Sequence, residues 1–427
     1  MSAVTHTTHA PAPALAVAKV HSWKAPISLA VFTVIAGVLF VGFGRDGTST
    51  FRLSTAADFI QLPDISVPTR LGCAVLVIIL VAITAYAFYV TSQYRKVHVG
   101  VLSLFGAVFL IAFLTWAAAE HTLSVPGLLI GSIGLSVPLI FGALGGVISE
   151  RVGVVNIAIE GQLLAGAFVS AVIADMTGQP LFGLVGAMIA GVLVSFVLAA
   201  FSIKYLVDQV IVGVVLNVLV LGITSFLYST LLVPNAEGLN TPERFSAINI
   251  PVLSQIPIIG PMFFRQTIIV YIMYVTVALV YVGLFHTKWG LRVRAVGEHP
   301  QAADTVGINV SSTRFWNVSL AGAIAGLGGA YLTLGSVGGF GKDMTAGVGF
   351  IALAAVIFGR WDPIRATLAA LLFGFASNLQ SVLTILEAPV PSQFMLMLPY
   401  LVTIFAVAGL VGASRGPAAA GKPYIKS

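Results

Sequence analysis

Long apolar stretches recur along the chain, and short polar segments separate them. A helix needs about 20 apolar residues to cross the hydrocarbon core of a bilayer, and about 17 to 25 are tolerated. Twelve stretches approach this length: residues 27–44, 71–90, 99–118, 127–148, 160–175, 181–203, 210–232, 267–286, 315–337, 345–359, 363–386 and 394–412. The pattern predicts an all-α fold, a polytopic transmembrane helical bundle of about 10 to 12 spans. Because the stretches at 160–175 and 345–359 are short, we expect broken or re-entrant helices there.

The composition supports a membrane-embedded chain. Hydrophobic residues make up 58% of the 427 positions and charged residues only 8%, whereas about a quarter of the residues in a soluble globular domain are charged. The formal net charge of +6 resides in short loops between apolar runs, where it orients the chain in the lipid bilayer. We therefore expect no nucleic-acid partner. The single cysteine, Cys73, lies within an apolar run, which predicts a packing role and excludes an intrachain disulfide.

The positions of Lys and Arg predict the orientation, because short cytoplasmic loops carry an excess of these residues. With the N-terminus inside, the inside segments contain Lys19, Lys24, Arg95, Lys96, Lys204, Lys288, Arg292, Arg294, Arg314, Arg360, Arg365, Arg415, Lys422 and Lys426. The loops on the other side are nearly neutral, because acidic residues offset their Arg residues. We expect a multi-pass protein of the cytoplasmic (inner) membrane with both termini in the cytoplasm. Residues 1–26 predict a disordered cytoplasmic tail, and residues 413–427 predict a second cytoplasmic tail.

Two glycine-interrupted segments break the apolar pattern, one in each half of the chain. They cover residues 145–161 and 335–349. Corresponding interruptions in two halves are typical of a transporter's substrate pathway, because broken helices leave backbone groups free to line a cavity. The alternative is that both segments are ordinary loops between neighbouring helices.

The first interrupted segment contains a dense cluster of polar residues: Glu150, Arg151, Asn156, Glu160 and Gln162. Ionisable groups at membrane depth are costly to insert and usually face a cavity or a partner. Asn156 and Glu160 are four positions apart and would share one face if this stretch is helical. Asn156, Glu160 and Gln162 are therefore candidate substrate-pathway residues. In the alternative interpretation, Glu150 pairs with Arg151, while Asn156 and Glu160 cap or bridge helix ends.

Further amides lie inside two apolar stretches. Gln209 stands at the start of the stretch at 210–232, and Asn217 lies inside it. Asn378 and Gln380 lie inside the stretch at 363–386. An amide offers a donor and an acceptor together, which suits a channel for a polar, uncharged solute. Asn217 and Asn378 are thus further pathway candidates. Amides in membrane helices also form hydrogen bonds between helices, and the sequence leaves both interpretations open.

The longest basic segment between two spans covers residues 286–314. Within it, Pro300 and Gly307 stand at the start and just past the end of a predicted helix of about seven residues. A short helix between membrane spans is a candidate docking surface for another protein. A solvated amphipathic loop is the alternative.

The chain lacks the motifs of an energy-supplying or catalytic site. The phosphate-binding motif G-x-x-x-x-G-K-[ST] does not occur, because Gly341-Lys342 is followed by Asp343 and Gly421-Lys422 by Pro423. The seven histidines stand apart, without metal-ligand spacing. We predict no cofactor and no metal site in this chain, no enzymatic activity, and an energy source in another chain or in a solute gradient.

Three stretches resemble the bacterial ABC-importer permeases of the branched-chain amino acid and ribose type. They are Leu144–Phe168 with its Ser-Glu-Arg-Val-Gly-Val-Val-Asn-Ile-Ala-Ile-Glu-Gly-Gln run, Gly290–Asn309 with its Ala-Val-Gly-Glu core, and Gly347–Pro363. Within that group, the chain is most similar to nucleoside permeases that work with a basic membrane lipoprotein. The resemblance extends over roughly residues 130–412, and it implies a permease core at 126–412 preceded by a transmembrane extension of about three spans at 27–125.

The resemblance also implies partners and roles. It implies a cytoplasmic ATPase subunit that binds ATP, a second permease subunit and an extracytoplasmic solute-binding lipoprotein. The Ala-Val-Gly-Glu loop and the helix after it would dock on the ATPase through Arg294, Gly297, Glu298, Ala303 and Gly307. Nucleosides are the expected solute, and Phe141, Phe168 and Phe350 lie beside the polar segments as stacking surfaces. The alternatives are a sugar or branched-chain amino acid permease, an ATP-independent channel or an ion-coupled carrier.

Overall fold

The computed structural model describes residues 23–56, 58–388, 390, 393–394, 397 and 416–425. Within these ranges, ten helices are long and apolar enough to cross a membrane. The predicted polytopic helical bundle is thereby confirmed. Most of the predicted span at 394–412 and most of the predicted N-terminal tail at 1–26 lie outside the described residues, as do the ends of the predicted C-terminal tail.

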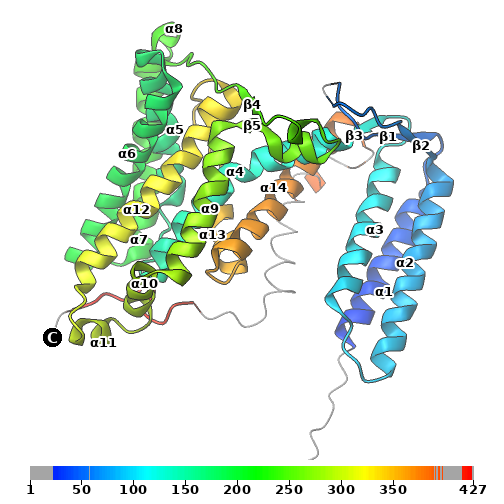
Figure 1. Ribbon diagram of the computed structural model, residues 1–427, viewed down its shortest axis with the longest axis horizontal. Helices are drawn as coiled ribbons and strands as arrows, with labels where there is room; N and C mark the ends of the chain where they lie inside the picture. The colour runs from blue at the N-terminus through cyan, green and yellow to red at the C-terminus, as the bar shows by residue number, and fades with distance from the viewer. Residues whose placement is uncertain are drawn as a thin grey trace, which may run out of the picture. The chain divides into compact units, whose positions relative to one another are not determined.

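The chain divides into two compact units. The first comprises the chain up to Thr50 together with Ile65–Thr122. Its helices are α1 (Lys24–Ala36, continued by a π-helical turn at Gly37–Gly42), α2 (Thr69–Ser92) and α3 (Val99–Ala117) (Figure 1). Strands β1 (Thr48–Arg52), β2 (Ile65–Pro68) and β3 (Thr122–Ser124) pair in the order β2-β1-β3. Within this unit, Phe40 from the π-helical turn after α1 packs against Phe109, Phe113 and Trp116 of α3.

The second unit comprises Phe51–Asp64 and the chain from Leu123 onward. Its elements are α4 (Val125–Arg151), α5 (Ile159–Thr177), α6 (Pro180–Ala199, with a π-helical turn at Ala200–Lys204), α7 (Gln209–Leu227, with a π-helical turn at Tyr228–Leu232), α8 (Ala236–Leu239), β4 (Ala247–Asn249), β5 (Arg265–Thr267), α9 (Ile268–His286), α10 (Lys288–Glu298), α11 (Pro300–Thr305), α12 (Val310–Ala330, with a π-helical turn at Tyr331–Val337), α13 (Val348–Phe358) and α14 (Pro363–Ile385). Strands β4 and β5 pair antiparallel. Figure 1 shows α5, α6 and α12 running side by side.

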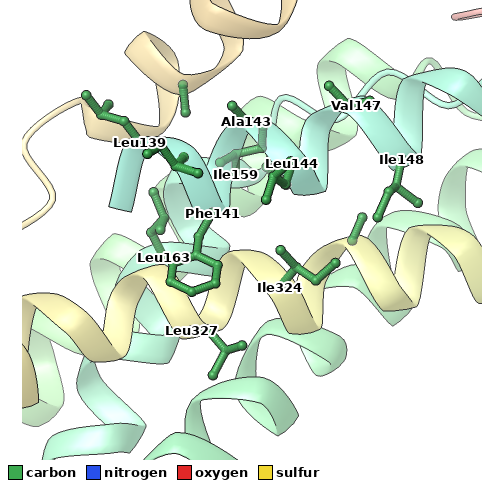
Figure 2. Packing of buried hydrophobic residues seen from close by; sticks show 14 of the residues in the cluster. Leu139, Phe141, Ala143, Leu144, Val147, Ile148, Ile159, Leu163, Ile324 and Leu327 are labelled. Atoms are coloured by element: carbon green, nitrogen blue, oxygen red, sulfur yellow. The ribbon is translucent and has the colours of Figure 1, made fainter. Parts of the chain in front are cut away.

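Helix α12 lies at the centre of the second unit. In its most apolar window, 83% of the residues are buried, whereas only 28% are buried in the corresponding window of α9. Its glycines permit this close packing, because a Cβ atom on Gly322 or Gly326 would collide with α6 and one on Gly329 would collide with α5. Small residues allow membrane helices to approach closely where no water is present to drive them together. On another side of α12, the side chains of Phe141 and Ile148 point toward it from α4 (Figure 2).

The two short apolar stretches have different outcomes. Residues 160–175 belong to α5, which has 19 residues and is long enough to cross a membrane. Residues 345–359 contain α13, which has only 11 residues and is therefore about 16 Å long, about half of a hydrocarbon core. A full span at 345–359 is thus wrong, and the expected broken helix is found there. The cause is local, because Gly338 and Gly347 have φ angles of +88° and +90°, outside the helical range.

Candidate functional site

The segment between α4 and α5 is a buried turn that two amide side chains organise. Helix α5 begins only at Ile159, so Asn156 precedes it and does not share a helix face with Glu160. The reason is that Asn156 bonds to a later residue: its Nδ2 donates to Gln162 Oε1 at 3.1 Å, and Gln162 Nε2 donates back to Asn156 Oδ1 at 3.3 Å. Gln162 Nε2 also donates to Ser195 Oγ at 2.9 Å, which connects α5 to α6. Both amides are fully buried, and this network satisfies them.

Helix α7 holds the backbone of the same turn with two further amides. Asn217 Oδ1 accepts from the Gly161 N–H and its Nδ2 donates to the Ile157 carbonyl, both at 2.8 Å. Gln209 Oε1 accepts from the Val155 N–H at 2.7 Å. Irregular backbone at membrane depth is tolerated only where its polar groups find partners inside the protein. The amides of α7 supply those partners.

Glu160 connects the two glycine-interrupted segments. Its Oε1 accepts from the Gly347 N–H at 2.8 Å and its Oε2 from the Gly349 N–H at 2.5 Å. These N–H groups belong to the start of α13, where the helix dipole favours a negative charge. A Cβ atom on Gly349 would collide with the backbone of Glu160, so only glycine allows this approach. The helix-end bridge that the sequence left open for Glu160 is therefore present.

Asn378 lies at a different place in the fold. Its Nδ2 donates to the Leu128 carbonyl at 2.6 Å and to Ser132 Oγ at 3.3 Å, which ties α14 to the first turns of α4. The structure thus brings four of the five pathway candidates together after the end of α4, and it places Asn378 near the opposite end of that helix. All five side chains form hydrogen bonds between elements, and contact with a solute stays a prediction.

The end of α4 is fixed to the loop that follows α13. Trp361 Nε1 donates to Glu150 Oε2, and Arg151 Nε donates to the Trp361 carbonyl at 2.8 Å. Glu150 and Arg151 thus each bind the segment around Trp361, which is the arrangement found in place of an interfacial pair between them. Arg360 and Trp361 both have positive φ angles, of 54° and 56°. These contacts compensate for the strain that such angles impose on residues with side chains.

Two residues with clear structural roles gave little signal in the sequence. Trp361 lies within the Gly347–Pro363 stretch, but its partner Glu150 is 211 positions away. Ser195 is a single hydroxyl inside an apolar helix, and its bond to Gln162 depends on how α5 meets α6. A lone serine in a membrane helix and a lone tryptophan in a loop have many ordinary roles, so only the contacts distinguish them.

The predicted short helix is found as α11, which begins at Pro300, and Gly307 follows it with a φ angle of +85°. Of the predicted docking residues, Gly297 and Ala303 are buried. A Cβ atom on Gly297 would collide with the Arg151 carbonyl, so the end of α10 packs directly against the end of α4.

The other predicted docking residues are more accessible. Glu298 and Gly307 are exposed, and the Arg294 guanidinium lies 5.3 Å from the centre of the Phe285 ring. Val306, between α11 and Gly307, is 74% exposed. The exposed surface of the α10–α11 segment therefore includes Glu298 and the turn after α11, while Gly297 and Ala303 are buried.

Comparison with known proteins identifies the family. The family model described as "Branched-chain amino acid transport system / permease component" matches residues 128–407. The chain belongs to this permease family. The resemblance of the sequence to ABC-transporter permeases is thereby confirmed, and the chain is a multi-pass membrane permease subunit.

Several curated relatives of this permease cover the same region. It is 42% identical over 300 residues to the guanosine ABC transporter permease protein NupQ of Bacillus subtilis, covering 68% of this chain and 93% of the relative. It is 41% identical over 302 residues to the nucleoside ABC transporter permease protein NupC of Lactococcus lactis, covering 68% and 94%. It is 35% identical over 254 residues to the putative glucose ABC transporter permease protein TsgC13 of Haloferax volcanii, covering 60% and 77%. No solved structure matches the permease.

Proposed function

We propose that this permease forms the translocation pathway of an ABC importer for nucleosides. The identity of 42% and 41% to permeases named for guanosine and nucleosides, over nearly their full lengths, carries the proposal. The family match at 128–407 contains the whole cluster around Glu160 and the α10–α11 segment. A pathway for polar, uncharged solutes suits a chain whose buried polar groups are mostly amides and hydroxyls.

Helix α13 supplies the half-helix that such a pathway requires. The loop directly after α13 is tied to the end of α4 through Trp361, and the first turn of α13 is tied to α5 through Glu160. Because α13 is about 16 Å long, Glu160 lies about half a hydrocarbon thickness from the end of α4. In transporters, discontinuous helices at this depth form the substrate site. We assign the substrate pathway to the surroundings of this junction, with Asn156, Gln162 and Asn217 fixing the turn beside it.

An aromatic side chain next to the junction can recognise a base. Phe350 follows Gly349 directly and is 49% exposed, whereas Phe141 is fully buried. Phe168 is 8% exposed and packs edge-on against Phe340 at 5.1 Å. A nucleobase gains free energy by stacking on an exposed ring. Among the three aromatic residues that the sequence suggested, Phe350 is the one available for stacking.

The mechanism that we propose is alternating access. ATP binding and hydrolysis in a separate ATPase subunit move the α10–α11 segment. Gly297 packs on the Arg151 carbonyl, so movement of α10 displaces the end of α4 and the turn that contains Asn156. That turn leads into Glu160, whose bonds to Gly347 and Gly349 transmit the movement to α13. The chain itself is not an enzyme in this proposal, and ATP is bound by the partner.

The proposal extends to the remaining partners and to the orientation. We assign a second permease subunit and an extracytoplasmic solute-binding lipoprotein as partners, supported by the ABC transporter names of the relatives. The alternation of Lys and Arg between loops supports a location in the cytoplasmic membrane with both termini in the cytoplasm. The family match from residue 128 onward supports a permease core at 126–412 with an added transmembrane extension at 27–125.

A sugar is the second candidate solute, because the chain is 35% identical to a permease named for glucose. The test is uptake of labelled guanosine in cells that carry this permease with its ATPase and binding protein. We expect unlabelled nucleosides to compete, while ribose, glucose and leucine do not. Competition by glucose or ribose at equal concentration would transfer the assignment to sugars, and competition by leucine would contradict the nucleoside proposal. Uptake that persists in vesicles with an ion gradient but without the ATPase would contradict the importer mechanism.

A further inference from the structure

The C-terminal strap, residues 416–425, lies against the ends of several helices of the permease. It follows the region matched by the family model, which ends at residue 407. Its Ala419 is 5% exposed, so the strap is packed into the protein at that position. At its beginning, a Cβ atom on Gly416 would lie 2.9 Å from the Trp361 ring. The first residue of the strap therefore lies beside Trp361, which connects the loop after α13 to the end of α4.

The strap is bonded to the end of α10. The Ala419 N–H donates to the Gly297 carbonyl at 2.9 Å, and the Ala418 N–H donates to Glu298 Oε2 at 3.2 Å. Gly297 also packs against the Arg151 carbonyl. The end of α10 is thus in direct contact with both the end of α4 and the strap.

The strap is also bonded to α12 through a buried charge. The Arg314 side chain is 2% exposed, and its Nη1 donates to the Lys422 carbonyl at 3.0 Å. Its Nε and Nη2 atoms have no hydrogen-bond partner among the residues that the structure describes. A buried guanidinium is costly when its donors are unpaired, so the carbonyl of the strap is a strong anchor for it. The charge pattern of the sequence assigned Arg314 to an inside segment between spans, and the structure places it in α12, where it is buried.

Gly153 is the point where these segments converge. It has a φ angle of +91°, and a Cβ atom there would lie 2.8 Å from Arg314 Nη2 and 3.3 Å from the Ala419 carbonyl oxygen. Gly153 belongs to the turn between α4 and α5 that leads to Asn156 and Glu160. The strap and α12 are therefore both in direct contact with the turn between α4 and α5.

The far end of the strap reaches α11. The Tyr424 phenol donates a hydrogen bond to the Asp304 carboxylate. Partial burial and this bond raise the pKa of the phenol. A cavity of about 490 Å³ separates this end of the strap from the turn between α11 and α12, and Ile308, Asn309 and Ser311 line it. The most buried residues of the strap are Pro417 and Ala419, while Tyr424 is half-buried beside this cavity.

We infer that the C-terminal strap is a coupling element, which makes the α10–α11 segment move as one body with the ends of α4 and α12. This inference rests on the proposed importer function. The strap positions α10 and α11, and it transmits their movement to the Gly153 turn through the Gly297 carbonyl and the Arg314 guanidinium. Without it, the ATPase subunit still binds and hydrolyses ATP, but less of that movement reaches the helices of the pathway.

The experiment uses the full complex of the permease, its ATPase and its binding protein in proteoliposomes. It compares the complete chain with a chain that lacks residues 416–427, and it measures ATP hydrolysed and nucleoside transported in the same sample. We expect transport per ATP to fall by about threefold or more, within the range by which residues outside two sites modulate their coupling. The amount of ATPase bound to the permease is expected to remain unchanged.

Two point variants test whether coupling depends on the bond between Arg314 and the strap. Arg314→Met removes the bond to the strap with little change in volume, and we expect it to lower transport per ATP in the same direction. Lys422→Ala is the matched control, because only the carbonyl of Lys422 binds Arg314 and its side chain is exposed. We expect this control to behave as the complete chain.

Three results would overturn the inference. An unchanged ratio of transport to hydrolysis in the truncated chain and in Arg314→Met would show that the strap has no coupling role. Loss of bound ATPase would show instead that the strap is part of the docking interface. A truncated chain that only unfolds at lower temperature, with an unchanged ratio in the folded fraction, would show a purely stabilising role. Failure of the importer proposal is separate, because the complete chain would then show no ATP-dependent nucleoside uptake.

Discussion

Glu160 Oε2 accepts a hydrogen bond of 2.5 Å from the backbone N–H of Gly349, a residue 189 positions later in the chain. This bond joins the start of α5 to the start of the half-helix α13. A carboxylate at membrane depth is costly, and here its charge is offset by two N–H groups and by the dipole of α13. The same bond connects the two glycine-interrupted segments, so it is a natural site for a structural change during transport.

Replacement of Glu160 tests this junction. In Glu160→Gln, one of the two acceptor oxygens becomes an NH₂ group, which cannot accept a hydrogen bond. The variant therefore loses its bond to the N–H of either Gly347 or Gly349. We expect uptake to fall about tenfold or more, because a hydrogen bond to a charged group contributes about 1.5–3 kcal/mol. The measurement is the initial uptake rate, normalised to the amount of permease in the membrane. Glu237→Gln, at an exposed position of α8, is the matched control. Equal uptake by both variants would contradict a role for the junction.

The pairing of Asn156 with Gln162 is tested by a double-mutant cycle. Each single replacement by Leu leaves one buried amide without its partner, which costs about 1–3 kcal/mol. The double replacement removes both, so we expect it to destabilise the protein by less than the sum of the single effects. The measurement is thermal unfolding in detergent. Asn156→Leu combined with Asn378→Leu is the control. These two residues bind different partners at different places in the fold, so their effects should add. Additivity in both pairs would disprove the coupling of Asn156 to Gln162.

The docking role of the α10–α11 segment is tested at Val306. Its side chain is 74% exposed, so Val306→Asp leaves the fold intact and places a charge on the proposed interface. We expect about tenfold less ATPase to co-purify, because burying an unpaired charge in an interface costs more than about 1 kcal/mol. Val252→Asp is the control, since Val252 is 75% exposed in the loop between β4 and β5.

Gly297 provides a contrast to Val306 within the same segment. It is buried, and a Cβ atom would meet the Arg151 carbonyl. Gly297→Ala should therefore lower stability and transport through packing. If Val306→Asp retained the ATPase, and replacement of Gly297 and Glu298 changed neither binding nor transport, the docking assignment would be wrong.

The proposed stacking surface is tested by Phe350→Ala. We expect the KM for nucleosides to rise about fivefold or more, because stacking a base on an aromatic side chain contributes about 1–3 kcal/mol. Phe350→Trp keeps an aromatic ring and is expected to retain nucleoside uptake. An unchanged KM in Phe350→Ala would exclude this ring from the substrate site.

Much of the secondary structure follows from the sequence alone. The apolar stretches predict the helices because a chain in lipid must satisfy its backbone hydrogen bonds within each segment. Local signals also fix the short helix α11, which begins at Pro300 and is followed by Gly307 with a positive φ angle. The stretch at 345–359 shows the limit of length as a signal, because glycines on its N-terminal side shorten α13 to 11 residues.

The candidate site could be located from the sequence, but its contacts could not be derived. The density of polar residues between 150 and 162 pointed to the right segment. The spacing of Asn156 and Glu160 suggested a shared helix face, but the helix begins at Ile159 and Asn156 turns back to Gln162 instead. Spacing rules apply only within a helix, and the start of a helix depends on which partners the preceding turn finds.

The sequence by itself determined that this chain is a polytopic membrane bundle, where most of its helices run, and which stretches resemble the permeases of its family. Only the tertiary structure decided which groups meet: Glu160 with Gly349, Glu150 with Trp361, and Arg314 with the carbonyl of Lys422. The physical reason is that helices form from local hydrogen bonds between residues four apart. The partner of a buried polar side chain is set by how helices pack, and that packing joins residues that lie 100 or more positions apart.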